Sequence, residues 1–153
     1  MTRGTCAVIA LTLLAARAAE SQARSALEVR VDGIAASRVT TVHLGVGGTR
    51  VVSRNLELQL VIGGGTAFRE GSSDNAAAGR GDLLARFAPL PANRRRWSAY
   101  VAGGLSVLVE RGTSGRAVLA LLVGMEGGRA RETRSFVELG VGGGVRLGAG
   151  VRF

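Results

Sequence analysis

Residues 135–153 read SFVELGVGGGVRLGAGVRF, and from residue 137 onward two kinds of side chain alternate up to the end. One set of alternate positions is mainly aliphatic and ends at Phe153, whereas the other holds glycines, two arginines and Glu138. Successive side chains of a strand point to opposite faces, so a period of two indicates extended chain. The glycines at 142–144 leave two interpretations, a three-residue hairpin loop or one over-long strand. The hairpin is favoured because roughly ten residues suffice for a strand to cross a bilayer.

The same alternation recurs along most of the chain and predicts an all-β protein. Eight strands are expected at residues 27–33, 39–52, 55–68, 82–90, 97–109, 117–126, 134–141 and 145–153. No stretch has a convincing helical period, although the alanines at 76–78 are the best helical candidate. The glycines around them favour a loop, and residues 69–81 are therefore assigned to one.

The sizes of the side chains indicate which face meets water. A soluble barrel needs bulky residues inside and many charges outside. Here the face opposite the aliphatic one is mostly glycine, alanine and serine with an occasional charge, which is typical of a crowded interior. We therefore expect an antiparallel up-and-down transmembrane β-barrel of about eight strands with its aliphatic face toward lipid. Six charged residues should pair across the lumen: Glu57, Arg86, Glu126, Glu138, Arg146 and Arg152.

The beginning of the chain has the layout of a secretory signal peptide. A short basic start with Arg3 precedes an apolar run at residues 6–16, and small residues follow. We predict a signal peptide at 1–18, with cleavage as late as residue 23, and a barrel domain at 27–153. Cys6 lies in the apolar run and would leave with it, so the exported chain would have no thiol.

Three stretches resemble the small bacterial outer-membrane β-barrel proteins of the OmpA/OmpX-like kind. They are LGVGGTRVVSRNLELQLVIGGG at 44–65, SAYVAGGLSV at 98–107 and VRLGAGVRF at 145–153, and the likeness spans roughly residues 39–153. The resemblance implies an outer-membrane location in a Gram-negative cell envelope, contact with outer-membrane lipids, and recognition of Phe153 by the barrel assembly machinery. It also implies that the chain end and the turns near residues 53, 91 and 127 are periplasmic. The loop at 69–81 would then face outward, where it could bind an extracellular ligand.

Composition and motifs argue against several other functions. The net charge of +9 comes from scattered arginines with few aromatics between them, so no nucleic acid partner is expected. The glycine clusters complete no nucleotide-binding motif, and the single histidine leaves no set of ligands for a metal. No catalytic residue, cofactor or metal site is therefore predicted, and the role is expected to be structural, adhesive or interactive.

Two alternatives remain open. In a lipid-hydrolysing barrel, such as a lipid A deacylase, His43 would act as the base for Ser98 or Ser106 and would need a carboxylate to orient it. In a secreted soluble β-barrel that binds a small apolar ligand, the row Leu56, Leu58 and Leu60 would line an internal cavity.

Overall fold

A computed structural model describes residues 25–71, 75–89, 97–127 and 133–153 of the 153-residue chain. The predicted signal peptide at 1–18 lies outside these described residues. All of the regular structure in them is β-strand. The strands are β1 (Ser25–Ala36), β2 (Val39–Val51), β3 (Leu56–Arg69), β4 (Ala76–Phe87), β5 (Ser98–Glu110), β6 (Arg116–Glu126), β7 (Arg134–Val141) and β8 (Val145–Arg152).

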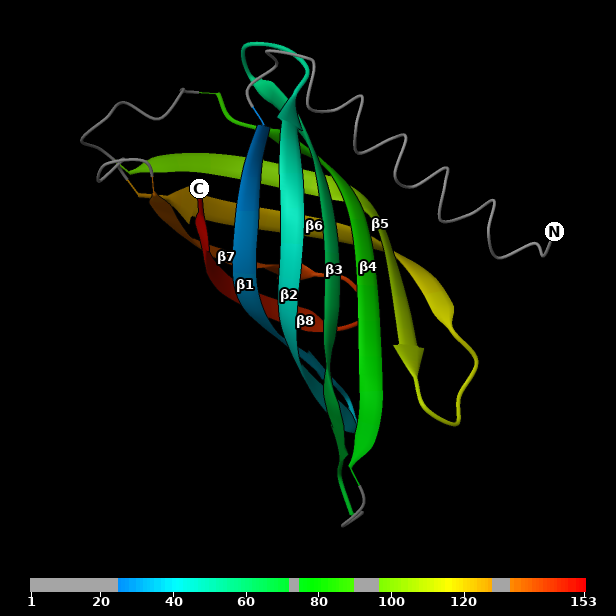
Figure 1. Cartoon of the computed structure of the whole chain (residues 1–153). Coiled ribbons are helices and arrows are strands. Elements are labelled where there is room, and N and C mark those ends of the chain that lie inside the picture. Colours follow the sequence, from blue (N-terminus) through cyan, green and yellow to red (C-terminus); the bar gives the residue numbers. More distant parts are fainter. Residues whose placement is uncertain (1–24, 72–74, 90–96, 128–132) are drawn as a thin grey trace, which may run out of the picture.

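The eight strands form one closed antiparallel barrel, as Figure 1 shows. Each strand pairs with its neighbours in sequence, and β1 also pairs with β8 through a register that places Val29 opposite Val151. Closure leaves no sheet edge with unpaired backbone groups, which is the condition for a sheet to exist in hydrocarbon. The prediction of an all-β, up-and-down barrel of eight strands is confirmed.

The last two strands are joined by a hairpin and are not one long strand. Val141 lies opposite Val145, and the Gly142 N–H donates to the Gly144 carbonyl at 3.0 Å. Gly143 between them has a φ of 81°, a left-handed backbone conformation that residues other than glycine rarely adopt. The three glycines therefore form a tight turn, and the hairpin interpretation is confirmed.

Three predicted strand boundaries are wrong by three residues or more, and one of them is the end of β4, which lies at Phe87 and not at residue 90. β1 does not end at Gly33 but continues to Ala36, which leaves only residues 37–38 for the turn into β2. β4 begins at Ala76, so the alanines at 76–78 form neither a loop nor a helix, and the connection before them is 70–75. Gly79 and Gly81 occupy the outward positions of this segment. Because they have no side chains, the aliphatic half of the alternation disappears there.

The connections divide between two ends of the barrel. One end, here called the terminal end, holds Ser25 and Phe153 together with the connections 52–55, 88–97 and 127–133. The opposite end, here called the far end, holds the connections 37–38, 70–75, 111–115 and 142–144. The turns expected near residues 53, 91 and 127 therefore share the end of the chain terminus, although residues 90–96 and 128–132 lie outside the described part.

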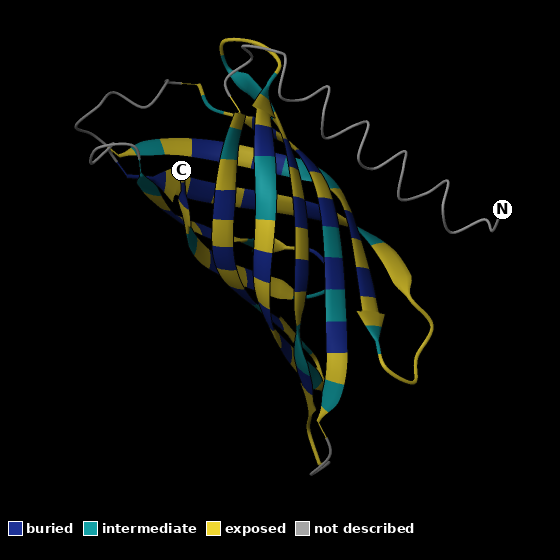
Figure 2. Cartoon of the chain, viewed as in Figure 1, coloured by how far each residue is buried: buried dark blue, intermediate teal, exposed yellow. Residues whose placement is uncertain are grey.

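Buried and exposed residues alternate along every strand, and Figure 2 shows them as bands around the barrel. The exposed positions carry most of the large aliphatic side chains, among them Leu27, Leu44, Ile62 and Leu119. The interior holds charged residues and a small apolar cluster of Leu84, Ala102, Ala120 and Leu122. Most of the leucines and valines thus point away from the lumen, in the arrangement of a barrel whose solvent is lipid.

Candidate functional site: the charged lumen

Among the described residues, the lumen holds equal numbers of buried positive and negative side chains. Five arginines and five carboxylates have less than a tenth of their surface exposed. They are Arg30, Arg80, Arg86, Arg146 and Arg152 with Glu28, Asp32, Asp82, Glu126 and Glu138. A buried charge without a partner costs several kcal/mol, so a balance of the two signs favours the fold. The positive excess of the whole chain therefore lies elsewhere.

A first cluster of ion pairs lies toward the terminal end. Arg86 on β4 donates to Glu57 at 2.6 Å and also to Glu126. Arg152 donates to Glu126 at 2.9 Å and to Glu28 at 2.8 Å, and so connects β8 with β6 and β1. Glu126 accepts a further hydrogen bond from the half-buried Arg134 at 2.9 Å. Glu126 thus joins three arginines from three different strands.

A second cluster lies in the middle of the barrel and is centred on Arg30. Its guanidinium donates to Asp32 at 2.8 Å, to Glu28 at 3.2 Å and to Glu138. Asp32 also accepts from Arg80 on β4 at 2.6 Å. Because Glu28 bonds both Arg30 and Arg152, the two clusters form one continuous network.

Two aromatic rings pack against this network. Phe136 lies between two guanidinium groups, with its ring centroid 5.3 Å from Arg30 and 5.1 Å from Arg152. Arg86 lies 3.7 Å from the centroid of the Tyr100 ring, whose hydroxyl donates to Glu138 at 2.7 Å. Guanidinium groups at these distances from an aromatic face gain cation–π attraction in addition to their ion pairs.

Inward glycines make room for these side chains. A Cβ atom built on Gly148 would lie 2.6 Å from Asp32 Oδ1 and 2.9 Å from Arg30 Nη2. One on Gly124 would lie 2.3 Å from Cζ and 2.5 Å from the hydroxyl oxygen of Tyr100. The glycines of the crowded face therefore mark where the large lumen groups lie.

The six residues named from the sequence all lie in this network. Glu57 and Arg86 are paired, Glu126 and Arg152 are paired, Glu138 bonds Arg30, and Arg146 bonds Asp82 at 2.7 Å. The structure does not bring all six together, because Glu138 and Arg146 bond none of the other five and join the network through Arg30 and Asp32.

Five of these ten buried charges were missed in the sequence analysis. Glu28, Arg30 and Asp32 alternate with the aliphatic residues of β1, and this was a signal for the lumen that could have been used. Arg80 lies in the segment that the sequence assigns to a loop, whereas Asp82 is the first residue of the predicted strand and was not recognised as a lumen charge. Both lie on the inward face of β4, with Asp82 bonded to Ser106 at 2.6 Å.

The arrangement required for a serine hydrolase is not assembled by the described residues. His43 is buried, and its Nδ1 atom has no hydrogen-bond partner among them. Ser106 donates directly to Asp82 without an intervening histidine. Ser98 begins β5 at the terminal end, whereas His43 lies in the far half of β2.

The row proposed for an internal apolar site points the wrong way for a soluble ligand-binding barrel. Leu58 and Leu60 are about half exposed on the outside of the wall, and Leu56 is partly exposed.

No group of three or more His, Cys, Asp or Glu in the described ranges is suited to a metal ion. Within the same ranges no helix is long and apolar enough to cross a membrane.

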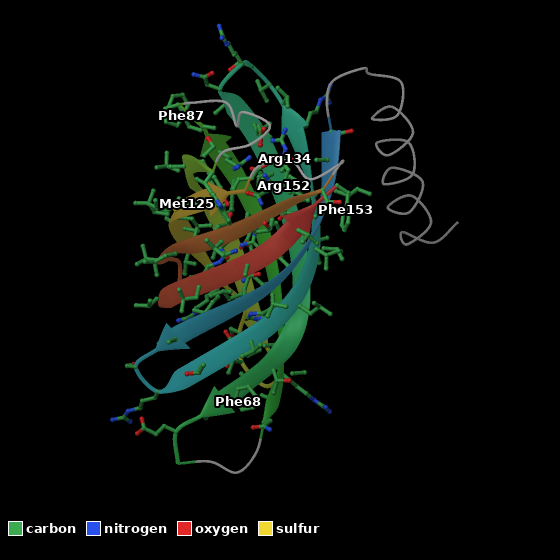
Figure 3. The ribbon with its side chains drawn as sticks, turned by 90° about the vertical axis from the view of Figure 1, so that its left-hand side faces the viewer. Phe68, Phe87, Met125, Arg134, Arg152 and Phe153 are labelled. Atoms are coloured by element: carbon green, nitrogen blue, oxygen red, sulfur yellow. The ribbon has the colours of Figure 1, made fainter. Side chains whose placement is uncertain are left out.

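Aromatic side chains on the outside lie near the two ends of the barrel. Phe87, Trp97 and Phe153 are exposed at the terminal end, and Phe68 is exposed at the far end. Figure 3 shows Phe87 and Phe153 near one end and Phe68 near the other, with Arg134 and Arg152 near the terminal end. Aromatic residues at both rims of an aliphatic band are typical of barrels that span a bilayer.

A closed antiparallel barrel of eight strands, aliphatic outside and charged inside, has the architecture of a small transmembrane β-barrel. The structure is similar to the crystal structure of the N-terminal β-barrel domain of Pseudomonas aeruginosa OprF. The TM-score is 0.56 at 14% sequence identity, over 86% of this chain and 100% of that one. It is also similar to the solution NMR structure of the de novo designed TMB2.3. There the TM-score is 0.55 at 18% identity, over 87% of this chain and 96% of that one.

These likenesses are likenesses of fold, and both neighbours are membrane barrels of this type. No protein-family model matches the chain, and no curated protein matches it.

Proposed function

We propose that this chain is an exported outer-membrane β-barrel with a structural, adhesive or interaction role and no catalytic step. The observation that carries the proposal is the division of side chains, with aliphatic residues on the outside and balanced buried charges within. In water, aliphatic residues on the outside would be costly because a continuous apolar wall would be exposed to solvent. Hydrocarbon stabilises the same wall.

The packed lumen supports a barrel without an open diffusion pore. Arginine and carboxylate side chains from opposite walls meet in the middle, for example Arg146 of β8 and Asp82 of β4. A cavity at the far end, beside His43 and Thr41, has a volume of about 20 Å³, which is room for one water molecule. Interiors of eight-stranded barrels are just wide enough for side chains to fill.

The proposal includes a direction in the membrane. The terminal end would be periplasmic, with a signal peptide at 1–18 directing export and Phe153 presented to the barrel assembly machinery. The far end would face outward, and the connection 70–75 takes the place of the longer loop first proposed as a ligand site. Arg69 and Glu110 beside it form an exposed ion pair at 3.2 Å, so this rim carries charge of both signs.

Fractionation followed by electrophoresis tests the membrane assignment. We expect the protein in the outer-membrane fraction and a shift in gel mobility between unboiled and boiled samples, because a folded membrane barrel resists SDS until heated. Single-channel recording in planar bilayers tests the packed lumen, and we expect no stable conductance of porin size. A protein found in the aqueous fraction with no heat-dependent shift would contradict the membrane assignment. A large, stable conductance would contradict the packed lumen.

A further inference from the structure

The outer wall carries a groove near the terminal end of β1, β2 and β3. Its volume is about 410 Å³, and its lining includes Leu27, Gly48, Arg50, Leu58 and Leu60. The register explains why the wall is hollow there. Leu27, Gly48, Leu60 and Leu83 are consecutive neighbours across four strands, so a row of leucines is interrupted by one residue without a side chain.

A single cation lies at the outer edge of this groove. Arg50 is exposed two residues beyond Gly48 on β2, about 7 Å closer to the terminal end at the rise of a strand. Its neighbours in the register are Ser25, the first residue of β1, and Leu58. Among the described residues Arg50 has no hydrogen-bond or ion-pair partner, unlike the arginines of the lumen. An exposed, unpaired arginine thus lines the terminal-end edge of this apolar groove.

This order of groups matches a phospholipid, and the unpaired positive charge of Arg50 favours one whose headgroup has a net negative charge. A phospholipid has its phosphate at the membrane interface and its acyl chains toward the midplane, and the wall offers an arginine at the strand end with a groove below it. Arginine binds phosphate through paired N–H donors, and an acyl chain fills an apolar notch. We propose that the groove binds one anionic phospholipid, with the phosphate at Arg50 and an acyl chain over Gly48. This inference rests on the proposed membrane location.

The two glycines of β2 and β3 that face outward provide a matched pair of variants. A Cβ atom on Gly48 would meet only the Ala26 carbonyl oxygen, at 3.8 Å, which is ordinary contact. A Cβ atom on Gly64 would meet nothing within 4 Å. G48L therefore fills the groove without forcing the backbone apart. G64L adds the same side chain to the outer wall away from the groove.

Native mass spectrometry of the detergent-solubilised barrel, with phosphatidylglycerol and phosphatidylcholine added in turn, tests the proposal. We expect the unaltered protein to retain one phosphatidylglycerol in preference to phosphatidylcholine. R50Q should weaken that preference about fivefold, the effect of one interfacial cation. G48L should reduce retention of phosphatidylglycerol, and G64L should leave it unchanged.

Each variant is first checked for its unboiled gel mobility. An intact barrel that retains both lipids equally, or that is indifferent to both R50Q and G48L, overturns this inference and leaves the proposed function in place. Loss of heat-dependent mobility in the unaltered protein removes the proposed function, and the lipid site with it.

Discussion

Asp82 on β4 and Arg146 on β8 form an ion pair at 2.7 Å although their strands lie four places apart in a ring of eight. They therefore join opposite walls of the barrel, which share no backbone hydrogen bonds. Both side chains are fully buried. The ion pairs of the network thus connect opposite walls across the lumen, in addition to the backbone hydrogen bonds between neighbouring strands.

Removing one partner of the Asp82–Arg146 ion pair should destabilise the barrel. We expect R146M to lower the free energy of unfolding by about 3–5 kcal/mol, because it leaves the Asp82 carboxylate buried beside one cation fewer. The double variant D82L/R146M should lose less than the single one, since it removes both charges. Urea titration of the barrel in lipid vesicles measures these values. R69A is the control, because its pair with Glu110 is exposed and should contribute at most about 1 kcal/mol.

The inward glycines should not tolerate a methyl group. We expect G124A to destabilise the barrel by about 1–3 kcal/mol, because its Cβ would overlap the Tyr100 ring and force it to move. G64A, on the open outer wall, should change stability far less. Thermal unfolding followed by unboiled gel mobility compares the two. Equal melting temperatures for both variants would mean that Tyr100 does not fill the space beside Gly124.

Charges placed on the outer face should be penalised according to depth. L121R, in the middle of β6, is expected to cost about 2–4 kcal/mol in a bilayer, whereas V52R, just beyond the end of β2, should cost about 0–1 kcal/mol. Both original side chains are exposed, so packing against the rest of the chain does not distinguish them. Unfolding in vesicles of one composition measures the difference. No dependence on depth would place this wall in water.

The side chain of Phe153 should matter for assembly more than for stability. It is exposed, and the Phe153 N–H donates to the Leu27 carbonyl at 2.8 Å, a bond that the backbone keeps in F153A. We therefore expect F153A to refold in detergent as the unaltered protein does, but to yield less folded barrel in cells. F68A removes an outward aromatic of similar exposure at the far end and is the control. Equal cellular yields for the two variants would argue against an assembly signal.

The sequence was sufficient for the fold because its main determinant is a period of two. Aliphatic positions from Leu27 to Val151 follow that period, and the strand order follows from the connections between neighbouring strands. Closure is the pairing of β1 with β8, which leaves no sheet edge in hydrocarbon. The alternation fails as a guide only where outward residues are glycines. This is why the alternation predicts a loop for the first half of β4, which includes Arg80.

The lumen was only partly predictable. Alternation tells which residues point inward, but the partner of each charge depends on the stagger between strands and on distance across the barrel. Asp82 and Arg146 are 64 residues apart in sequence and on strands that do not pair, so no local pattern could join them. The groove beside Arg50 could not be predicted from the sequence for the same reason. It exists because the register places Gly48 between Leu27 and Leu60 of the adjacent strands.

The central claim is that the aliphatic face meets lipid and the charged face does not. Spin labels at single cysteines test it most directly, in a chain whose Cys6 is replaced by serine and which is reconstituted in vesicles. Labels at Leu44, Ile62 and Leu121 should collide readily with oxygen, which dissolves in lipid, and rarely with a water-soluble nickel complex. Frequent collisions with nickel and few with oxygen at these three positions would contradict the account.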